Sequence, residues 1–481
     1  MKKNLFKMCF SLIALLLLSF ILIGCKKTDD GKTHIKVHVL NRGYGIQWMN
    51  TIIDKFEAEN PTIKVDLEAT ANEDQVINKN INSKKNSDDL YVSVGADWMT
   101  YAAQNKFANL DDLMDETVDG VKLKDKVSAE YKNSINYPDA NGDLHTYRLP
   151  WIKSTGGIFY NKAMFEANGW SVPTTYAELV ALCEQIVDEA IPVENQSYTV
   201  APFVYTGQNT DYFDYAVYTW WAQLAGEENI KEFLNYSSAS NFNASTNSTY
   251  AKLKEATKLW ADLFTNSDYV LENCSGLDNH DAQRKFVRGE AAMMFNSDWI
   301  YNEILGYEIN SSDFELALMK TPTAQGAVES NILYTVGEDQ YIAIPESSTH
   351  KAEAKLLIKY IVSDFGCKAF LKDANGLLGY DCNFTESDAT NSFTKNLLNI
   401  RSQYTKTFTN YPKLNKGDDK TNKWLYLSGL IDVWFSGGQR PYENILKSTK
   451  SVDEALNEGF TSIANAAQSQ WDTIRQQAGL A

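Results

Sequence analysis

Cysteine and histidine are scarce in this chain, and the short motifs that identify common enzymes are missing. Six cysteines and five histidines occur in 481 residues. No two cysteines form a CxxC pair, the spacing typical of a zinc site. Neither GxSxG nor HExxH occurs, and residues 43–48, GYGIQW, do not complete GxGxxG because Trp48 replaces the third glycine. The sequence therefore predicts no catalytic residues, no cofactor and no metal.

Positive charge is also in short supply. Lysine and arginine together number 45 against 62 aspartates and glutamates, which gives a formal net charge of −17. Phosphate backbones and anionic lipid surfaces repel so acidic a protein. We therefore expect no nucleic-acid partner, no direct membrane contact by the folded body, and a monomer.

Long hydrophobic runs are absent except at the N-terminus. Residues 9–24, CFSLIALLLLSFILIG, follow a basic head with Lys2, Lys3 and Lys7. The run is shorter than the roughly 20 residues of a spanning helix and has the form of a secretory signal. Residues 22–25, LIGC, resemble a bacterial lipobox, which predicts a signal peptide over 1–24, lipid on Cys25 and a linker over 25–33. A simple membrane anchor and an ordinary cleaved signal are the alternatives.

This N-terminus predicts a secreted chain, lipid-anchored on the extracellular face of the bacterial cytoplasmic membrane. Four cysteines then remain in the folded body: Cys183, Cys274, Cys367 and Cys382. An extracellular setting permits disulfides. Cys367–Cys382 is one candidate pair, which spacing alone does not establish.

Hydrophobic periodicity predicts an α/β protein. Removal of residues 1–24 leaves 457 residues, a length that suits two lobes. Apolar residues alternate over 35–39, 63–67 and 90–94 and have helical spacing over 48–56, and a polar helix is expected over 73–83. Strands that alternate with helices form parallel sheets, and ligands bind beyond the carboxyl ends of such strands. This topology nominates Arg42, Tyr44, Asp97 and Trp98 as ligand contacts.

Five segments, in this order, resemble one family. They are KFEAENPTIKVDLE, YRLPWIKSTGGIFYNKAMFEANGWSVPTTYAEL, FVRGEAAMMFNSDW, SSTHKAEAKLLIKYIVS and VDEALNEGF. Together they resemble the maltose-binding-type (family 1) extracellular solute-binding proteins of ABC importers, carbohydrate class. The resemblance is spread over nearly the whole chain after the lipobox.

The resemblance implies a two-lobed, type II periplasmic-binding-protein-like fold with a ligand cleft between the lobes. Lobe one would comprise residues 34–150 and 328–378, and lobe two residues 151–327 and 379–481. The segment RLPWIKST would be the first crossing between the lobes, which puts Trp151, Ser154 and Thr155 on the cleft floor.

The family pattern also implies ligand contacts elsewhere. Asp97 takes the place of a carboxylate that bonds sugar hydroxyls, with Trp98 beside it. Trp299, preceded by Asp298, and Trp424 take the places of stacking aromatics. Ser154 or Thr155 falls near a position where the maltose-binding protein has glutamate, a departure that bears on maltose-type specificity. The residues alone allow other roles for two of the nominated contacts. Asp97 could cap a helix, and Arg42, nominated by topology, could form a surface salt bridge.

The resemblance implies a substrate-binding component of an ABC importer that captures a sugar, in particular an oligosaccharide, by cleft closure. Delivery would be to membrane permease subunits served by a separate ATPase chain. A binder of a non-sugar solute such as a peptide or polyamine, and an extracellular glycoside-active enzyme, are the alternatives. A receptor that presents its ligand to a sensor protein would need the same closure.

Overall fold

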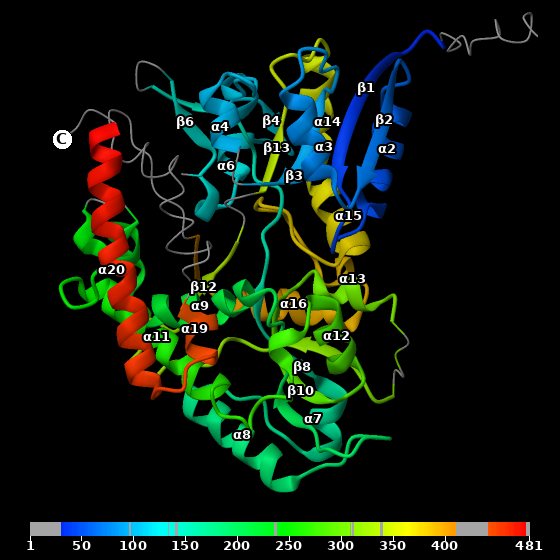
Figure 1. Ribbon diagram of the computed structural model, residues 1–481. Coiled ribbons are helices and arrows are strands. Elements are labelled where there is room, and N and C mark those ends of the chain that lie inside the picture. The colour runs from blue at the N-terminus through cyan, green and yellow to red at the C-terminus, as the bar shows by residue number, and fades with distance from the viewer. Residues whose placement is uncertain are drawn as a thin grey trace, which may run out of the picture.

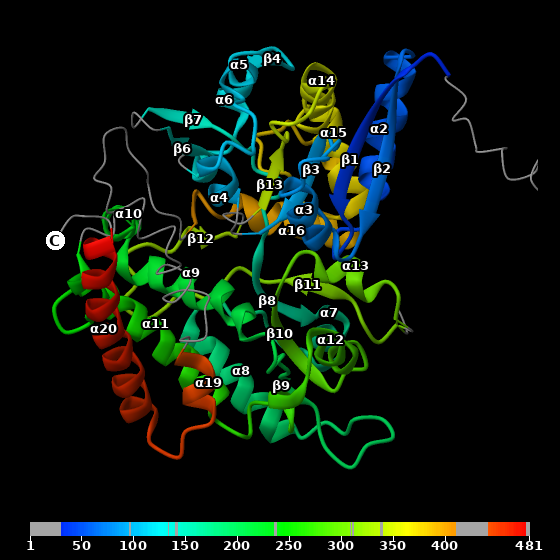
Figure 2. The same ribbon diagram turned by 45° about the horizontal axis from the view of Figure 1, so that its top comes forward.

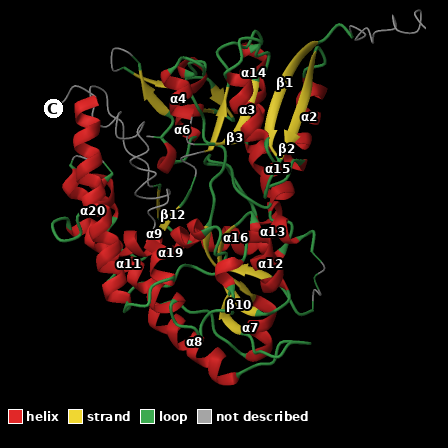
Figure 3. Cartoon of the chain, viewed as in Figure 1, coloured by secondary structure: helices red, strands yellow, loops and turns green. Residues whose placement is uncertain are grey.

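The computed structural model describes residues 30–95, 98–132, 134–139, 143–234, 238–307, 309, 312–336, 340–409 and 441–477. Two lobes, each built around its own sheet, lie one above the other in Figure 1. Helices dominate the lower lobe (Figure 3). Within the described residues, no helix combines the length and apolar character that crossing a bilayer requires.

Lobe one contains a four-stranded sheet in the order β13-β3-β1-β2. Its strands are β1 (Thr33–Leu40), β2 (Ile63–Thr70), β3 (Leu90–Val94) and β13 (Gln340–Ala343), and its larger helices are α2 (Gln47–Glu59), α3 (Glu73–Ile81), α14 (Lys351–Ile361) and α15 (Asp364–Ala374). β1 runs parallel to β2 and β3, whereas β13 is antiparallel to β3. Alternating Ile35, Val37 and Val39 are fully buried in this lobe's core, as their period of two predicts.

Lobe two contains a four-stranded sheet in the order β11-β8-β10-β9. Its strands are β8 (Gly156–Asn161), β9 (Ala201–Phe203), β10 (Ala291–Ser297) and β11 (Leu316–Leu318), and its larger helices are α7 (Lys162–Asn168), α8 (Tyr176–Glu189), α9 (Asp214–Ala225), α11 (Ser248–Phe264), α12 (Asn279–Val287), α16 (Ser392–Ser402) and α20 (Val452–Gln477). Thr175 and Glu178 form the capping box that starts α8. The α/β class and the two-lobed architecture predicted from the sequence are thus confirmed.

Shorter elements complete the two lobes. Lobe one adds α4 (Trp98–Ala103), α5 (Asp111–Met114), β4 (Thr117–Val118), β5 (Val121–Lys122), α6 (Leu123–Lys126), β6 (Asn136–Pro138) and β7 (Leu144–Thr146). Lobe two adds α10 (Glu227–Phe233), α13 (Ile300–Ile304), β12 (Ile332–Tyr334), β14 (Lys406–Phe408) and α19 (Pro441–Leu446).

The sequence assigns residues 328–378 to lobe one, and the structure differs at the start of this range. Ile332, Leu333 and Tyr334 pack in the hydrophobic core of lobe two. Their strand, β12, pairs in parallel with β14 of the same lobe. We therefore propose that the second crossing between the lobes falls between Tyr334 and Gln340, several residues later than the sequence suggests.

A disulfide joins Cys367 of α15 to Cys382, the pair that the sequence left open. Cys183 and Cys274 are buried free thiols, and burial raises the pKa of Cys274 to about 11. These two thiols are therefore protonated at neutral pH and poor nucleophiles.

Removal of this disulfide is expected to destabilise the fold measurably. The bond closes a loop with a sequence separation of 15, for which the loss of chain entropy in the unfolded state is worth about 3 kcal/mol. Cys382→Ser should lower the free energy of unfolding in urea by about that amount. A reductant should lower the stability of the wild type to the same level and leave the variant unchanged. Equal midpoints for oxidised and reduced wild type would contradict the bond.

Candidate ligand-binding cleft

A cleft of about 860 Å³ lies between the two lobes. Figure 2 shows one lobe above and the other below the place where the chain enters β8. Lobe one contributes Leu40, Asn41, Arg42, Gly43, Tyr44, Gly45, Ala71, Asn72, Val94 and Gln340 to the lining. Lobe two contributes Asn209, Asp211, Tyr212, Asp214, Tyr215, Asn279, His280, Trp299, Asn302, Glu303, Tyr334 and Val336, and the first crossing contributes Trp151 and Ile152.

The lobe-one wall is formed where the strands of its parallel sheet end. β1 ends at Leu40 and β2 ends at Thr70, so the loops after both strands meet at this edge. Arg42 Nε donates a hydrogen bond to the Ala71 carbonyl oxygen at 2.8 Å and Nη2 lies 3.2 Å from Asp74 Oδ1. The guanidinium is half-exposed, so it lines the cleft and also forms the surface ion pair that was its alternative role.

Gly43 brings this wall into direct contact with lobe two. A Cβ atom on Gly43 would lie 2.7 Å from Trp299 Cβ, closer than two carbon atoms can pack. Only glycine allows the backbone to approach the indole of the other lobe this closely.

Trp299 is the side chain around which the aromatic part of the cleft is arranged. It packs against the hydrophobic cores of both lobes. Tyr44, Tyr212 and Tyr215 meet its ring edge-on, with centroid separations of 6.2, 6.2 and 5.8 Å. Edge-to-face contacts of this kind hold aromatic rings in fixed orientations. Trp299 therefore occupies a position where it can contact a ligand and the opposite lobe at once.

Tyr44 and Asp298 form a hydrogen bond across the lobes. The Tyr44 hydroxyl donates to Asp298 Oδ1 at 2.5 Å, and the Thr155 backbone N–H donates to Oδ2 at 3.2 Å. Asp298 is fully buried, and this burial raises the pKa of its carboxyl to about 7. Burial and the neighbouring Asp298 charge raise the pKa of Tyr44 as well. The pair thus links the loop after β1 to the end of β10 in a water-excluded setting.

A second polar link between the lobes runs through side-chain amides. Asn302 Nδ2 of α13 donates to the carbonyl oxygen of Ala374, the last residue of α15, at 2.6 Å. Asn375 Nδ2 donates to Asn302 Oδ1 at 2.7 Å, and Asn391 Nδ2 donates to Asn375 Oδ1 at 2.7 Å. The end of α15 is therefore tied to α13, the helix that follows Trp299.

Two buried polar atoms in the cleft lining have no hydrogen-bond partner within the described chain. Trp151 Nε1 is a donor and Gln340 Oε1 is an acceptor. An unpaired buried polar group costs about 1–3 kcal/mol, so both atoms favour a ligand that supplies partners. A hydroxyl group can accept one hydrogen bond and donate another.

Acidic groups outnumber basic groups in the described lining. Asp214 accepts a hydrogen bond from the Tyr442 hydroxyl at 2.9 Å, and Glu303 accepts one from Gln283 Nε2 at 2.5 Å. Burial raises the pKa of Glu303. Both carboxyl groups accept hydrogen bonds from protein donors. Asp211 is exposed.

Several residues nominated from the sequence lie elsewhere. Trp98 is fully buried in a separate small core, with the Arg148 guanidinium 4.5 Å from its ring centroid, so it does not line the cleft. Ser154 is buried beneath the floor, where its Oγ accepts from the Val336 N–H at 3.3 Å. Thr155 and Asp298 are also buried beneath the lining.

Other nominated residues do reach the cleft or lie outside the described residues. Arg42, Tyr44, Trp151 and Trp299 line the cleft, and all four were named from topology or from the resemblance. Asp97, Trp424 and Cys25 lie outside the described residues, so their roles stay predictions.

Sequence reasoning missed the aromatic wall of lobe two. In the aromatic segment YAVYTWWAQLAG, Tyr218 and Trp221 are buried in the core. Tyr212 and Tyr215, six and three residues before Tyr218, line the cleft instead. Spacing along α9 relates Tyr215 to Tyr218, but it does not reveal which end of the helix faces the other lobe.

The protein has two α/β lobes joined by several crossings, and both lobes line the cleft between them. This arrangement is typical of proteins that enclose a solute between two lobes. Comparison with known proteins agrees with this class. Residues 43–364 match the family model for bacterial extracellular solute-binding proteins. The chain belongs to this family, and it is therefore a binding protein and not an enzyme.

Curated proteins match this chain at low sequence identity, and solved structures share its fold. The multiple sugar-binding protein of Streptococcus mutans is 22% identical over 357 residues, 72% of this chain and 76% of that protein. A probable sugar-binding periplasmic protein of Rhizobium meliloti is 26% identical over 233 residues, 45% of this chain and 50% of that protein. A solved chitin oligosaccharide binding protein has a TM-score of 0.63 at 18% identity, covering 91% of this chain and 99% of the other. The raffinose complex of the solute-binding protein RafE has a TM-score of 0.60 at 17% identity, covering 90% and 100%.

Asp298 should make stability depend on pH in an identifiable way. Its pKa is about 7 in the folded protein and about 4 when unfolded, so between these values the folded state binds more protons. The protonated carboxyl group should therefore contribute stability that is fully present below pH 4. This part of the free energy of unfolding should be lost as the pH rises to 7, by at most about 1.4 kcal/mol per pH unit. Urea titrations of wild type and Asp298→Asn at pH 4.5 and 7.5 measure this difference. Parallel profiles for the two proteins would show that Asp298 does not titrate in this range.

Proposed function

We propose that the protein binds a sugar, in particular an oligosaccharide, in the cleft between its lobes and delivers it to the permease of an ABC importer. The observation that carries this proposal is the pairing in one cleft of aromatic rings with buried polar atoms that lack partners. Trp299, Tyr212 and Tyr215 supply the rings, and Trp151 Nε1 and Gln340 Oε1 supply the polar atoms.

A sugar matches both kinds of surface. The C–H faces of its rings are apolar and pack on aromatic side chains, while its hydroxyls both donate and accept hydrogen bonds. The volume of about 860 Å³ lies in the upper part of the roughly 300–1,000 Å³ range of small-molecule sites, which supports more than one sugar ring. The sugar-binding names of the relatives point to the same ligand class.

The finer assignments rest on the sequence. Lipidation of Cys25 would hold the binding protein at the extracellular membrane surface, near permease subunits whose ATPase is a separate chain. Arg42, Tyr44, Trp151 and Trp299 are the proposed ligand neighbours within the described chain, and Asp97 and Trp424 are proposed to join them. The acidic net charge supports a monomer without nucleic-acid partners.

A melting-temperature screen of residues 26–481 against mono- and oligosaccharides, peptides and polyamines tests the ligand class. A ligand that binds only the folded state at a hundredfold excess over its Kd stabilises it by about 2.7 kcal/mol. We expect a shift with one sugar series. The exposed Asp211 and the other carboxyl groups of the lining are the reason to include polyamines. A shift with a polyamine or peptide and with no sugar would contradict the proposed ligand.

Trp299→Ala should weaken binding of the sugar found in that screen by at least about 0.5–1.5 kcal/mol, the amount that an aromatic contact adds beyond burial. Calorimetric titration measures the change. Phe365→Ala is the matched control, because Phe365 is an exposed aromatic residue of α15 outside the cleft lining. Equal affinities for wild type and Trp299→Ala would remove Trp299 from the site.

Cys25→Ala should abolish incorporation of a labelled fatty acid into the protein, because without the thiol there is no atom to carry the lipid. Membrane association is not the readout, because the variant retains the apolar run of residues 9–24. Fatty-acid labelling that persists in the variant would contradict lipidation at Cys25.

A further inference from the structure

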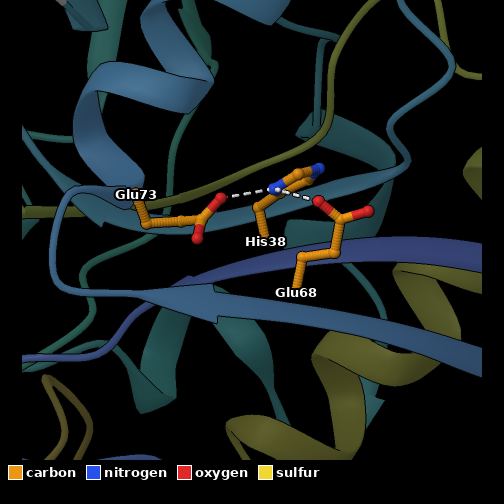
Figure 4. Close-up of side chains that lie close together, drawn as sticks. All are labelled: His38, Glu68 and Glu73. Carbon is orange, nitrogen blue, oxygen red and sulfur yellow. Dashed lines mark hydrogen bonds and ion pairs between the residues drawn. The ribbon is translucent and has the colours of Figure 1, made fainter.

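A buried histidine in lobe one faces two carboxyl groups with one of its ring nitrogens. His38 lies on β1, Glu68 on the neighbouring β2, and Glu73 is the first residue of α3. His38 Nδ1 is 2.6 Å from Glu73 Oε1 and 3.8 Å from Glu68 Oε2 (Figure 4). His38 and Glu73 are at most 1% exposed, whereas Glu68 is about half-exposed. One donor atom from each of the three residues lies within 4.8 Å of the other two.

A third carboxyl group sits at the other ring nitrogen. His38 Nε2 lies 3.1 Å from Asp88 Oδ1, which is ion-pair distance but not hydrogen-bond geometry. Asp88 is held in place by Asn80 Nδ2 and the Tyr91 hydroxyl, which donate to Oδ2 at 2.8 and 2.9 Å. A carboxylate at one ring nitrogen places the hydrogen there and turns the lone pair of the other nitrogen outward, as in histidines that bind metals. In His38 that lone pair would face Glu73 and Glu68.

The charges of this cluster do not balance among themselves. Glu68, Glu73 and Asp88 provide three carboxylates. Lys36 provides one ammonium group, 3.2 Å from Glu68 Oε1 and 3.2 Å from Asp88 Oδ1. With His38 neutral, two negative charges remain uncompensated. Lys36 contacts Oε1 of Glu68, which leaves Oε2 facing His38.

A separate observation concerns the second oxygen of Glu73. Glu73 Oε2 is buried and accepts no hydrogen bond within the described chain. A buried carboxylate oxygen without a partner is costly, and more so than a neutral group. A cation next to this carboxyl group would compensate it.

We propose that His38 Nδ1, Glu68 and Glu73 bind a divalent cation of the zinc class, with Asp88 as the carboxylate that orients the imidazole. One nitrogen and two carboxylate oxygens are a ligand set that Zn²⁺ accepts. Bonds of about 2.0–2.2 Å in tetrahedral geometry separate the ligand atoms by about 3.3 Å. His38 Nδ1 lies 2.6 and 3.8 Å from the two carboxylate oxygens, on either side of that value. All three donor atoms lie within 4.8 Å of one another, so side-chain shifts would bring them to ligand distance. The sequence predicted no metal, because these ligands come from three elements and form no motif.

The proposed cation site is adjacent in sequence to residues that line the cleft. Ala71 and Asn72, which line the cleft, directly precede Glu73. A cation that joins Glu73 to β1 and β2 would fix the start of α3 and with it this part of the cleft wall. The proposed metal site does not depend on the identity of the solute.

Zinc binding to the mature protein, extracted in detergent and stripped with a chelator, tests the proposal. Titration of Zn²⁺ against a chromophoric competitor should show one tight site per chain, and elemental analysis after desalting should return one zinc. Glu73→Gln and Glu68→Gln should each weaken binding by at least the 10–100-fold that loss of an orienting partner costs. Zn²⁺ should also raise the melting midpoint of the wild type and not that of Glu73→Gln.

Asp66→Asn is the matched control. Asp66 is a part-exposed carboxylate on the same strand, and it contacts His34 Nδ1 at 3.1 Å, but it lies outside the cluster. Its replacement should leave zinc binding unchanged. The proposal is overturned if wild type binds no stoichiometric zinc, or if Asp66→Asn loses zinc while Glu73→Gln and Glu68→Gln retain it. Because Glu68 is half-exposed, Glu68→Gln keeps the test informative if Glu73→Gln does not fold.

Discussion

The hydrogen bond from Tyr44 to Asp298 is the constraint on which the arrangement of the cleft depends. It joins the loop after β1 to the end of β10, at a level of the molecule where both lobes supply side chains to the cleft. Trp299 follows Asp298 directly, so the bond also fixes how closely Gly43 meets the indole. Because the pair is buried, water does not compete for it, and its strength depends on keeping the surrounding aromatic rings packed.

The fold was largely predictable because its signals are local. Alternating apolar residues in 33–40 and 63–70 and helical spacing in 47–59 identify a parallel sheet with helices. The capping box at Thr175 and Glu178 marks where α8 begins. The proposed later crossing has no local signal, because β12 is three residues long and pairs with β14, some 70 residues further on. Pairing at such a distance leaves no pattern in the short strand itself.

The cleft was predictable only in part. Topology led to Arg42 and Tyr44, which line the cleft, since the carboxyl ends of β1 and β2 share one edge of the sheet. The same argument nominated Trp98, but the helix that begins there turns its indole into a separate core against Arg148. Tyr212 and Tyr215 were missed, and Ser154 and Thr155 lie below the floor. Whether a side chain faces the cleft depends on how two lobes meet, which neither lobe's periodicity encodes.

A crystal structure of the protein with the oligosaccharide that raises its melting temperature tests the central claim most directly. The account predicts density for the sugar between the lobes, against Trp299 and Tyr212 on one side and Arg42 and Asn72 on the other. It also predicts that Trp151 Nε1 and Gln340 Oε1 gain hydrogen-bond partners. A sugar bound to the outer surface of a single lobe, with the interlobe cleft unchanged, would contradict it.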